Sequence, residues 1–549
     1  MTTEFKLKLQ DNPNDIPNGH KVEVDVDGIE GGKVLLLKVN GTLRALNPRC
    51  THYGAPLVKG VVTGDGRITC PWHGACFHID TGDIENAPAL DYLNSFPVQV
   101  RNSEVFITAS EEKIKSGRRR PEIQCKAVNT GEHVVVVGGG SGAIGAIESL
   151  REKGFTGLIT CISKEPYYPI DRTRISKALA TDLQKLQWRD SEFFKNAGVD
   201  FRLGTTVSEV DFNHKKVKLE DGQEVSYTKV ILATGGTPKR LPIEGFNLGN
   251  VFLLRGVDDA RAIVEAVGDK KDKKIVVIGS SFIGMELGNY LANQKNDVTI
   301  IGMESAPLER VMGAQIGQVF QKLVTSAGAK FKMSASVERA TPSVADPTKV
   351  GGIQLKFDEI IPADLVILGV GVTPETRYIK DESLLLKDKS LEVDDHYRVK
   401  GVQDAYAVGD IASYPYKGPG AKEASLVRIE HWNVAQGCGR LVGAHIAKGE
   451  KPTSFIPIFW SALGVQLRYC GNTMPRGYDD IVVQGNLEEA KFIAFYTLGE
   501  IVVAVASMQK DPAMAQAAEL MRRGGMLTKS ELKAGGDIMK VDVTARVAI

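Results

Sequence analysis

The chain has 549 residues and a mass of 59.5 kDa, which is enough for three or four domains with cores of their own. The 68 basic and 67 acidic residues give a formal net charge of +1, which excludes a bulk field that would attract nucleic acid or an anionic membrane. A hydrophobic content of 43% and 57 glycines are typical of an α/β protein with many tight turns. Seven cysteines are too few for a disulfide scaffold and indicate a reducing compartment.

The amino-terminal residues contain neither an apolar signal core nor an arginine-rich amphipathic leader. No run of apolar residues approaches the length of a membrane span. We therefore expect a cytoplasmic protein, with an association with mitochondria left open.

Two short motifs near the N-terminus each combine one cysteine with one histidine: Cys50-Thr51-His52 and Cys70-Pro71-Trp72-His73. Two thiolates and two imidazoles are the ligands of a Rieske [2Fe–2S] cluster, in which histidines replace cysteines on one of the two irons. A tetrahedral zinc site could use the same four residues, but zinc boxes usually pair like with like. The surrounding sequences resemble Rieske cluster loops, and we predict an iron–sulfur site with Cys50, His52, Cys70 and His73 as ligands.

The domain order follows from changes in pattern along the chain. Residues 1–110 contain short predicted strands, such as 33–39 before the turn Asn40-Gly41, and indicate an all-β module that carries both boxes. Residues 111–130 are polar and are predicted to be a solvated linker, a tether that would reach about 25 Å and give an effective concentration on the order of millimolar. The remaining predicted parts are two halves of an FAD-binding domain (131–255 and 374–454), an NAD(P)H-binding domain (256–373) and a C-terminal α+β domain (455–549).

Two strand–turn–helix units predict two dinucleotide-binding folds. The first has a buried strand at 133–137 followed by Gly138, Gly140 and Ala143. Gly138 would allow the tight turn, Gly140 would let a pyrophosphate approach the backbone, and Ala143 would keep the helix close to the strand. The helix N-terminus would then receive the phosphate charge.

Later segments match boxes of pyridine-nucleotide flavoprotein reductases. These are 231–238, with Ala233, Thr234 and Gly235, and 404–412, with Asp410. The segment 165–177 resembles the E-P-x-x-P-Y-x-R-x-x-L-S-K segment of oxygenase-coupled ferredoxin reductases and apoptosis-inducing-factor-type flavoproteins. With the Rieske-like module in front, nearly the whole chain resembles the apoptosis-inducing-factor-like group of the member 3 type.

This resemblance implies roles for individual residues. Asp410 would bind the ribityl side of FAD, and Arg172 and Lys177 would line its pyrophosphate and flavin. The acid that should hold the adenosine ribose is not settled, because Lys164 stands nearest that position and Glu165 follows it. Disulfide-reductase relatives carry a cysteine pair beside the flavin, and this chain has none.

The second unit has its turn residues at Gly279, Ser281 and Gly284, after a strand at 274–278. By resemblance, Glu286 would lie near the nicotinamide, and Gly371 belongs to the strand end that closes that site. Gly302 stands where an acid usually selects NADH, and Glu304 follows two residues later, so the choice between NADH and NADPH stays open.

Two boxes near the C-terminal domain, 430–432 and 459–461, match the E-x-W and F-W-S boxes of ferredoxin reductases. By resemblance, Trp432 and Trp460 approach the flavin, with Trp460 nearest the face where an iron–sulfur partner docks. Ordinary core tryptophans are the alternative.

These parts predict an NAD(P)H-dependent flavoprotein oxidoreductase in which FAD links a two-electron donor to a one-electron cluster. The predicted catalytic residues are Lys177, Glu286 and Trp460. Expected cofactors and partners are FAD, a [2Fe–2S] cluster, NADH or NADPH and an unknown one-electron acceptor protein, without nucleic acid, in a monomer or homodimer. The alternative is an apoptosis-related signalling flavoprotein in which bound NADH switches assembly.

Overall fold

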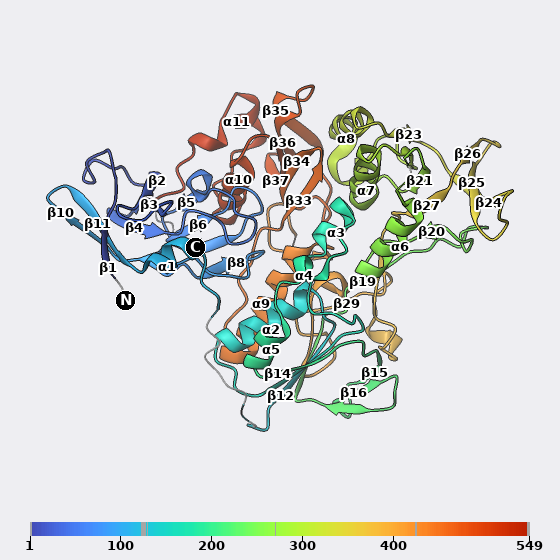
Figure 1. The fold of residues 1–549 in the computed structure, drawn as a ribbon, viewed down its shortest axis with the longest axis horizontal. Helices are drawn as coiled ribbons and strands as arrows, with labels where there is room; N and C mark the ends of the chain where they lie inside the picture. The colour runs from blue at the N-terminus through green and yellow to red at the C-terminus, as the bar shows by residue number, and fades with distance from the viewer. Residues whose placement is uncertain (1–2, 122–127, 129, 270, 423–424, 546–549) are drawn as a thin grey trace.

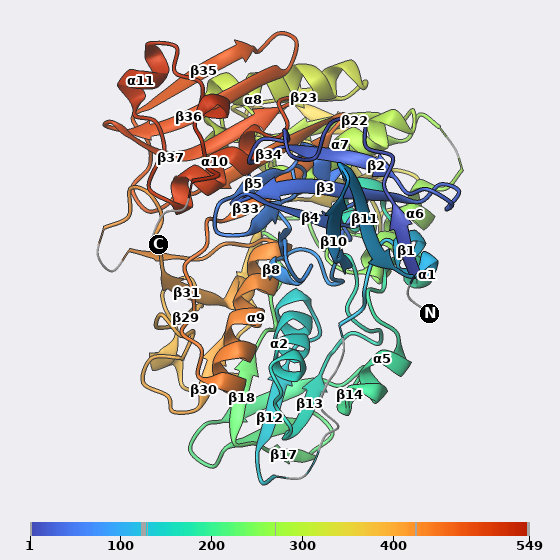
Figure 2. The same cartoon turned by 90° about the vertical axis from the view of Figure 1, so that its left-hand side faces the viewer.

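The computed structural model describes residues 3–121, 128, 130–269, 271–422 and 425–545. Figure 1 shows an N-terminal β module and a C-terminal domain side by side, with two α/β domains adjoining them. Chain order and spatial order differ, since the C-terminal domain lies against the N-terminal one, as Figure 2 also shows.

The N-terminal module consists of three small antiparallel sheets. The predicted strand and turn at 33–41 are confirmed, because β3 (Lys33–Val39) pairs with β4 (Thr42–Leu46) across Asn40 and Gly41, which both have positive φ. The strands of the three sheets, in spatial order, are β2 (Lys21–Asp25), β3, β4 and β9 (Ser95–Phe96); β1 (Thr3–Lys6), β11 (Glu104–Ala109) and β10 (Val98–Arg101); and β5 (Val61–Thr63), β6 (Arg67–Thr69), β7 (Cys76–His78) and β8 (Ile84–Asn86).

The expected solvated linker is wrong for its first third. Residues 111–116 form helix α1 (Glu111–Ser116), which the Ser110 side chain caps and which buries Ile114. Arg119 then exchanges two backbone hydrogen bonds with Tyr92 of the module. The segment is ordered because one apolar side chain and a helix cap fix it to the β module; residues 122–127 and 129 of the predicted linker lie outside the described residues.

The first α/β domain has a parallel sheet in the order β14-β13-β12-β18-β30. The predicted strand at 133–137 is the central strand β12, whose four valines are all buried in a core formed with two helices and a small antiparallel sheet. The elements are β12 (His133–Val137), α2 (Ser141–Glu152), β13 (Leu158–Ile162), α3 (Thr173–Ala178), α4 (Leu183–Leu186), α5 (Ser191–Asn196), β14 (Val199–Arg202), β15 (Val207–Asp211), β16 (Lys216–Leu219), β17 (Glu224–Ser226), β18 (Lys229–Leu232), β29 (Leu391–Glu392), β30 (Ala405–Ala407), β31 (Ala412–Pro415), β32 (Leu426–Val427) and α9 (Trp432–Lys448).

Helices α2 and α9 pack at unusually close range. A Cβ on Gly439 of α9 would lie 2.1 Å from the carbonyl oxygen of Gly142 in α2, so only glycine fits there. This contact brings the start of α9, with Trp432, next to the glycine-rich turn before α2.

The second α/β domain repeats the arrangement, with sheet order β20-β27-β21-β22-β23 and a small antiparallel sheet beyond it. The predicted strand at 274–278 is its central strand. The elements are β19 (Gly236–Pro238), β20 (Val251–Phe252), α6 (Val257–Val267), β21 (Lys274–Ile278), α7 (Phe282–Asn293), β22 (Asp297–Ile301), α8 (Glu309–Ser326), β23 (Lys330–Lys332), β24 (Val337–Pro342), β25 (Val350–Leu355), β26 (Ile360–Pro362), β27 (Leu365–Leu368) and β28 (Val372–Pro374).

The C-terminal domain is an antiparallel sheet in the order β33-β34-β37-β36-β35, packed on helix α10. Its elements are β33 (Ile458–Leu463), β34 (Val465–Gly471), β35 (Asp480–Asn486), β36 (Lys491–Leu498), β37 (Ile501–Met508), α10 (Ala513–Arg522) and α11 (Lys529–Lys533). The α+β prediction for this region is confirmed.

Candidate functional site

The two cysteine–histidine boxes form loops with matching backbone hydrogen bonds. The N–H of Cys50 donates to the carbonyl of Ala55, and the N–H of Cys70 donates to that of Ala75, at 2.9 and 2.8 Å. In each loop the N–H of a glycine, Gly54 or Gly74, returns to the carbonyl of the cysteine. Both glycines have positive φ, which lets the chain turn back within five residues.

The four side chains meet as a cysteine pair and a histidine pair. Cys50 and Cys70 are buried and share a hydrogen bond, and the Nδ1 atoms of His52 and His73 lie 3.0 Å apart. In the described ranges no group of three His, Cys, Asp or Glu side chains is arranged to hold a single metal ion. A Rieske cluster needs two cysteine ligands for one iron and two histidine ligands for the other. The cysteine pair and the histidine pair therefore fit a [2Fe–2S] cluster of this type.

Protonation of the ligands suits metal binding as well. Burial lowers the pKa of His52 to about 3, and burial also lowers the pKa of His73. Both imidazoles are therefore neutral near pH 7 and have a lone pair available for a metal. Cys76, which follows the second box, is buried and free, and burial raises the pKa of its thiol.

A cavity of about 1050 Å³ runs along the carboxyl ends of both parallel sheets. The first glycine turn forms one wall. A Cβ on Gly138 would lie 2.3 Å from the carbonyl oxygen of Ala233, whereas a Cβ on Gly140 would meet no atom within 4 Å. Ala143 is fully buried beneath the turn. The open space above Gly140, at the N-terminus of α2, fits a dinucleotide pyrophosphate.

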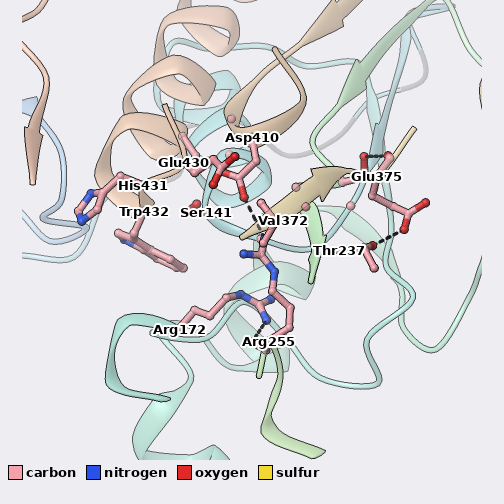
Figure 3. Close-up of a pocket in the computed structure, with 18 of the residues that line it drawn as sticks. Ser141, Arg172, Thr237, Arg255, Val372, Glu375, Asp410, Glu430, His431 and Trp432 are labelled. Atoms are coloured by element: carbon pink, nitrogen blue, oxygen red, sulfur yellow. Dashed lines mark hydrogen bonds and ion pairs between the residues drawn. The ribbon is translucent and has the colours of Figure 1, made fainter. Parts of the chain in front are cut away.

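Charged residues line the same wall. Arg172 makes two hydrogen bonds to the Glu165 carboxylate, at 2.9 and 2.7 Å, and a third to the backbone carbonyl of Arg255. The Arg255 side chain reaches Asp410 at 3.1 Å and lies beside Gly235 (Figure 3). Lys164, Thr234 and Ala233 line the cavity too. Burial opposes ionisation of Glu165, but Arg172 prevails, and the pKa of this carboxyl is lowered.

The second glycine turn lies farther along the cavity. A Cβ on Gly279 would lie 2.3 Å from the carbonyl oxygen of Gly369, and one on Gly284 would lie 2.0 Å from the carbonyl oxygen of Gly279. Ser281 is the N-cap of α7 without a side-chain cap bond, and Gly371 leaves open space above it. Glu304 follows β22 and forms an ion pair with Arg310 at 2.7 Å.

A buried carboxylate connects the two α/β domains with the C-terminal domain. Glu286 is 3% exposed and pairs with the Lys177 ammonium at 2.9 Å. Its two oxygens also accept hydrogen bonds from the hydroxyls of Ser176 and Ser461, at 2.5 and 2.6 Å. The three donors come from α3 and β33 and fix the carboxylate at the cavity wall.

The cavity and the cysteine–histidine loops meet at Trp460. Its indole lines the cavity, and its ring centre lies 4.2 Å from that of His73. His431 packs edge-on against the same indole at 4.7 Å. Trp432 also lines the cavity, and its indole Nε1 has no hydrogen-bond partner among the residues that the structure describes. A buried donor without a partner beside a large cavity fits a bound group there.

The N-terminal module is docked, and the expected free tether is wrong. Arg189 is almost fully buried and binds Asp91 of the module at 2.8 Å and Glu148 of α2 at 2.7 Å. Thr69 donates to Glu519 of α10 at 2.9 Å, and Tyr53 donates to Asp171. These buried contacts between domains hold the cysteine–histidine loops against the cavity. The N-terminal module therefore does not have to move on a tether to reach it.

Several residues at this site gave no signal in the sequence. Arg255 and Glu375 face the cavity from segments that match no box (Figure 3). Trp188 and Tyr53 both stack on the ring of His52, with ring centres 5.6 and 3.9 Å from it. His431 was visible only as the middle residue of the E-x-W box.

Comparisons with known proteins agree with this geometry. Residues 8–97 match the Rieske [2Fe-2S] domain, residues 132–439 match the pyridine nucleotide-disulphide oxidoreductase family, and residues 458–539 match the reductase C-terminal domain. Apoptosis-inducing factor 3 of Homo sapiens is 34% identical over 94% of this chain and 84% of its own length. Rhodocoxin reductase of Rhodococcus erythropolis is 30% identical over 69% of this chain and 86% of its own length. The predicted resemblance and fold class are confirmed.

A solved structure matches as well. The covalent putidaredoxin reductase–putidaredoxin complex has a TM-score of 0.66 and 27% identity, over 72% of this chain and 94% of the matched chain. The family implies FAD and NAD(P)H as cofactors, and the Rieske domain implies a [2Fe–2S] cluster. None of the helices in the described ranges combines the length and apolar character required to cross a membrane.

Proposed function

Because the chain belongs to the pyridine nucleotide-disulphide oxidoreductase family, in the group of Apoptosis-inducing factor 3, and carries a Rieske domain, we propose that it moves electrons from NAD(P)H to a one-electron acceptor. When bound, FAD can accept a hydride and release single electrons, and the [2Fe–2S] cluster can accept them one at a time. The acceptor itself is left as a protein of unknown identity.

The observation that carries this proposal is the position of Trp460. Its indole lines the cavity and also contacts the ring of His73, a proposed cluster ligand. A flavin site and a cluster site are thereby in contact through a single side chain. The matched complex joins a reductase to a separate protein, putidaredoxin; we propose that here the chain's own Rieske domain takes the partner's place.

We assign the FAD-binding role to the first glycine turn and the residues around it. Gly138, Gly140 and Ala143 would receive the pyrophosphate at the start of α2. We propose Glu165, fixed by Arg172, rather than Lys164 as the residue that would bind the adenosine ribose, because a carboxylate can accept hydrogen bonds from the ribose hydroxyls. Asp410, fixed by Arg255, would bind the ribityl hydroxyls. The remaining proposed contacts are Ala233, Thr234, Gly235, Lys177 and Trp432.

The nicotinamide nucleotide would bind at the second turn, on Gly279, Ser281, Gly284 and Gly371. Glu304 is the acid nearest the end of β22, and a ribose 2′-hydroxyl could donate to it, so we propose a preference for NADH. The Glu286 carboxylate would hold the Lys177 ammonium at the flavin side of the cavity, where the cation can favour a reduced, more negative ring.

Stopped-flow absorbance with NADH tests this function. The wild type should show reduction of the flavin and then of the cluster, and should turn over with cytochrome c as a one-electron acceptor. His73→Ala should keep fast flavin reduction and lose cluster reduction. Flavin reduction without any turnover would overturn the oxidoreductase function and favour the signalling alternative.

A further inference from the structure

A buried arginine of the C-terminal domain faces the cluster loops. Arg468 is 4% exposed and lies on β34 directly opposite Trp460 of β33. Directly opposed residues of an antiparallel pair project from the same face of the sheet. Since Trp460 contacts His73 on that face, Arg468 lies on the side of the sheet that covers the cluster loops.

The charge of Arg468 is only partly neutralised. One nitrogen, Nη1, donates to Gln466 at 3.1 Å, and Nε lies 3.5 Å from Asp511, at the long limit of a hydrogen bond. Nε makes no hydrogen bond within the described part of the chain. A buried cation with one distant counter-charge lowers stability, so packing alone gives no reason for an arginine here.

The same cation is a neighbour of the ligand loops. Trp460, its partner across the strand pair, lies with its ring centre 4.2 Å from that of His73 and 5.6 Å from that of His52. A Cβ on Gly74, in the second ligand loop, would lie 2.5 Å from the Ile458 side chain of the same strand β33. A charge at Arg468 thus lies close enough to act on the proposed ligand set through Coulomb interaction.

We propose that the buried positive charge of Arg468 raises the reduction potential of the cluster held by Cys50, His52, Cys70 and His73. The negative charge of Asp511 lowers that potential and so opposes the effect of Arg468. Reduction adds a negative charge to the cluster, and a buried cation nearby stabilises the reduced form. A residue of the C-terminal domain therefore adjusts the reduction potential of the cluster in the N-terminal domain. This inference rests on the proposed function, because it requires a Rieske cluster at these residues.

An EPR-monitored redox titration of the intact holoprotein tests the inference, and its readout is independent of turnover. Arg468→Gln should change the ratio of reduced to oxidised cluster about tenfold at a fixed potential, which is a shift of 59 mV to more negative values. Asp511→Asn should shift the potential in the opposite direction. Arg468→Lys keeps the charge and should stay close to the wild type.

Arg522→Gln is the matched control, because Arg522 also joins the two domains through Asp65 and Glu519 but lies on α10 rather than opposite Trp460. Unchanged potentials in Arg468→Gln and Asp511→Asn, or shifts of both in the same direction, would overturn the inference. If Arg468→Gln does not fold, Asp511→Asn decides it: a shift to more positive potential supports the inference, and an unchanged or more negative potential overturns it. A wild type without a Rieske-type EPR signal would overturn the proposed function itself.

Discussion

The imidazole of His73 and the indole of Trp460 lie with their ring centres 4.2 Å apart, although one belongs to the first domain and the other to the last. This contact exists only because the Rieske domain is seated on the reductase by buried charges and hydrogen bonds. Because the Rieske domain is docked, it does not have to diffuse to the reductase before each electron is transferred from the cavity to the cluster. We therefore expect transfer within the chain to be insensitive to protein concentration.

Replacing Trp460 should slow the reduction of the cluster. Trp460→Ala removes the side chain that fills the space between the cavity and His73, and Trp460→Phe keeps an aromatic ring. We expect cluster reduction after NADH mixing to be severalfold slower in the alanine variant and less affected in the phenylalanine variant, measured by stopped-flow absorbance. Trp72→Phe, a change 6.3 Å from His73 on the Rieske side, is the control. Equal rates in all three variants would remove Trp460 from the route.

The cysteine ligands can be tested by metal analysis. Cys50→Ser and Cys70→Ser should each lose the cluster, so that about two irons and two acid-labile sulfides per chain fall towards zero while FAD stays bound. Cys76→Ser changes a cysteine that is equally buried but belongs to neither pair, and it should keep both. Stoichiometric zinc without labile sulfide in the wild type would contradict the iron–sulfur assignment.

Local patterns in the sequence were sufficient for the cluster loops and the two nucleotide turns. The residues Cys50, His52, Gly138 and Gly279 stand within a few positions of the strands that place them, so spacing alone predicts their geometry. The turn at Asn40-Gly41 was predicted for the same reason.

The docking of the Rieske domain could not be predicted in this way. Arg189 binds Asp91 and Glu148, three residues from three segments that no periodicity or spacing connects. Ile114 is a single apolar residue in a polar stretch, and the polar stretch predicts a linker. In the structure Ile114 is buried by the short helix α1. Arg468 carries no motif, and only the pairing of β33 with β34 brings it opposite Trp460.

Removing Arg189 should weaken the docking of the Rieske domain. Arg189→Met leaves Asp91 and Glu148 buried without their shared cation, at a cost of about 3–5 kcal/mol. We expect a lower denaturant midpoint, followed through the visible absorbance of the cluster, and slower cluster reduction. Lys185→Ala removes an exposed ion pair with Asp182 and should cost no more than about 0.5 kcal/mol. A midpoint in Arg189→Met equal to that of Lys185→Ala would show that these buried charges do not hold the domains together.

Coenzyme preference should depend on Glu304 rather than on position 302. A Cβ at Gly302 would lie 2.5 Å from the Ser280 hydroxyl and 2.6 Å from the Met333 methyl group, so an acid there would disturb the strand end. Glu304→Gln removes the charged acceptor for the ribose 2′-hydroxyl, and the ratio of kcat/KM for NADH over NADPH should fall about tenfold, since a hydrogen bond to a charged group contributes about 1.5 kcal/mol.

Glu309→Gln is the matched control for this prediction, because Glu309 lies on the same segment but its carboxylate binds Ser305 and the backbone N–H of Ala306. It should leave the coenzyme ratio unchanged. The loss of Glu304 also frees Arg310, which is 76% exposed in its side chain and could then attract a 2′-phosphate. NADPH turnover should therefore improve in Glu304→Gln and return to the wild-type value in Glu304→Gln combined with Arg310→Ala. If the single variant keeps the wild-type ratio, another residue distinguishes the two coenzymes.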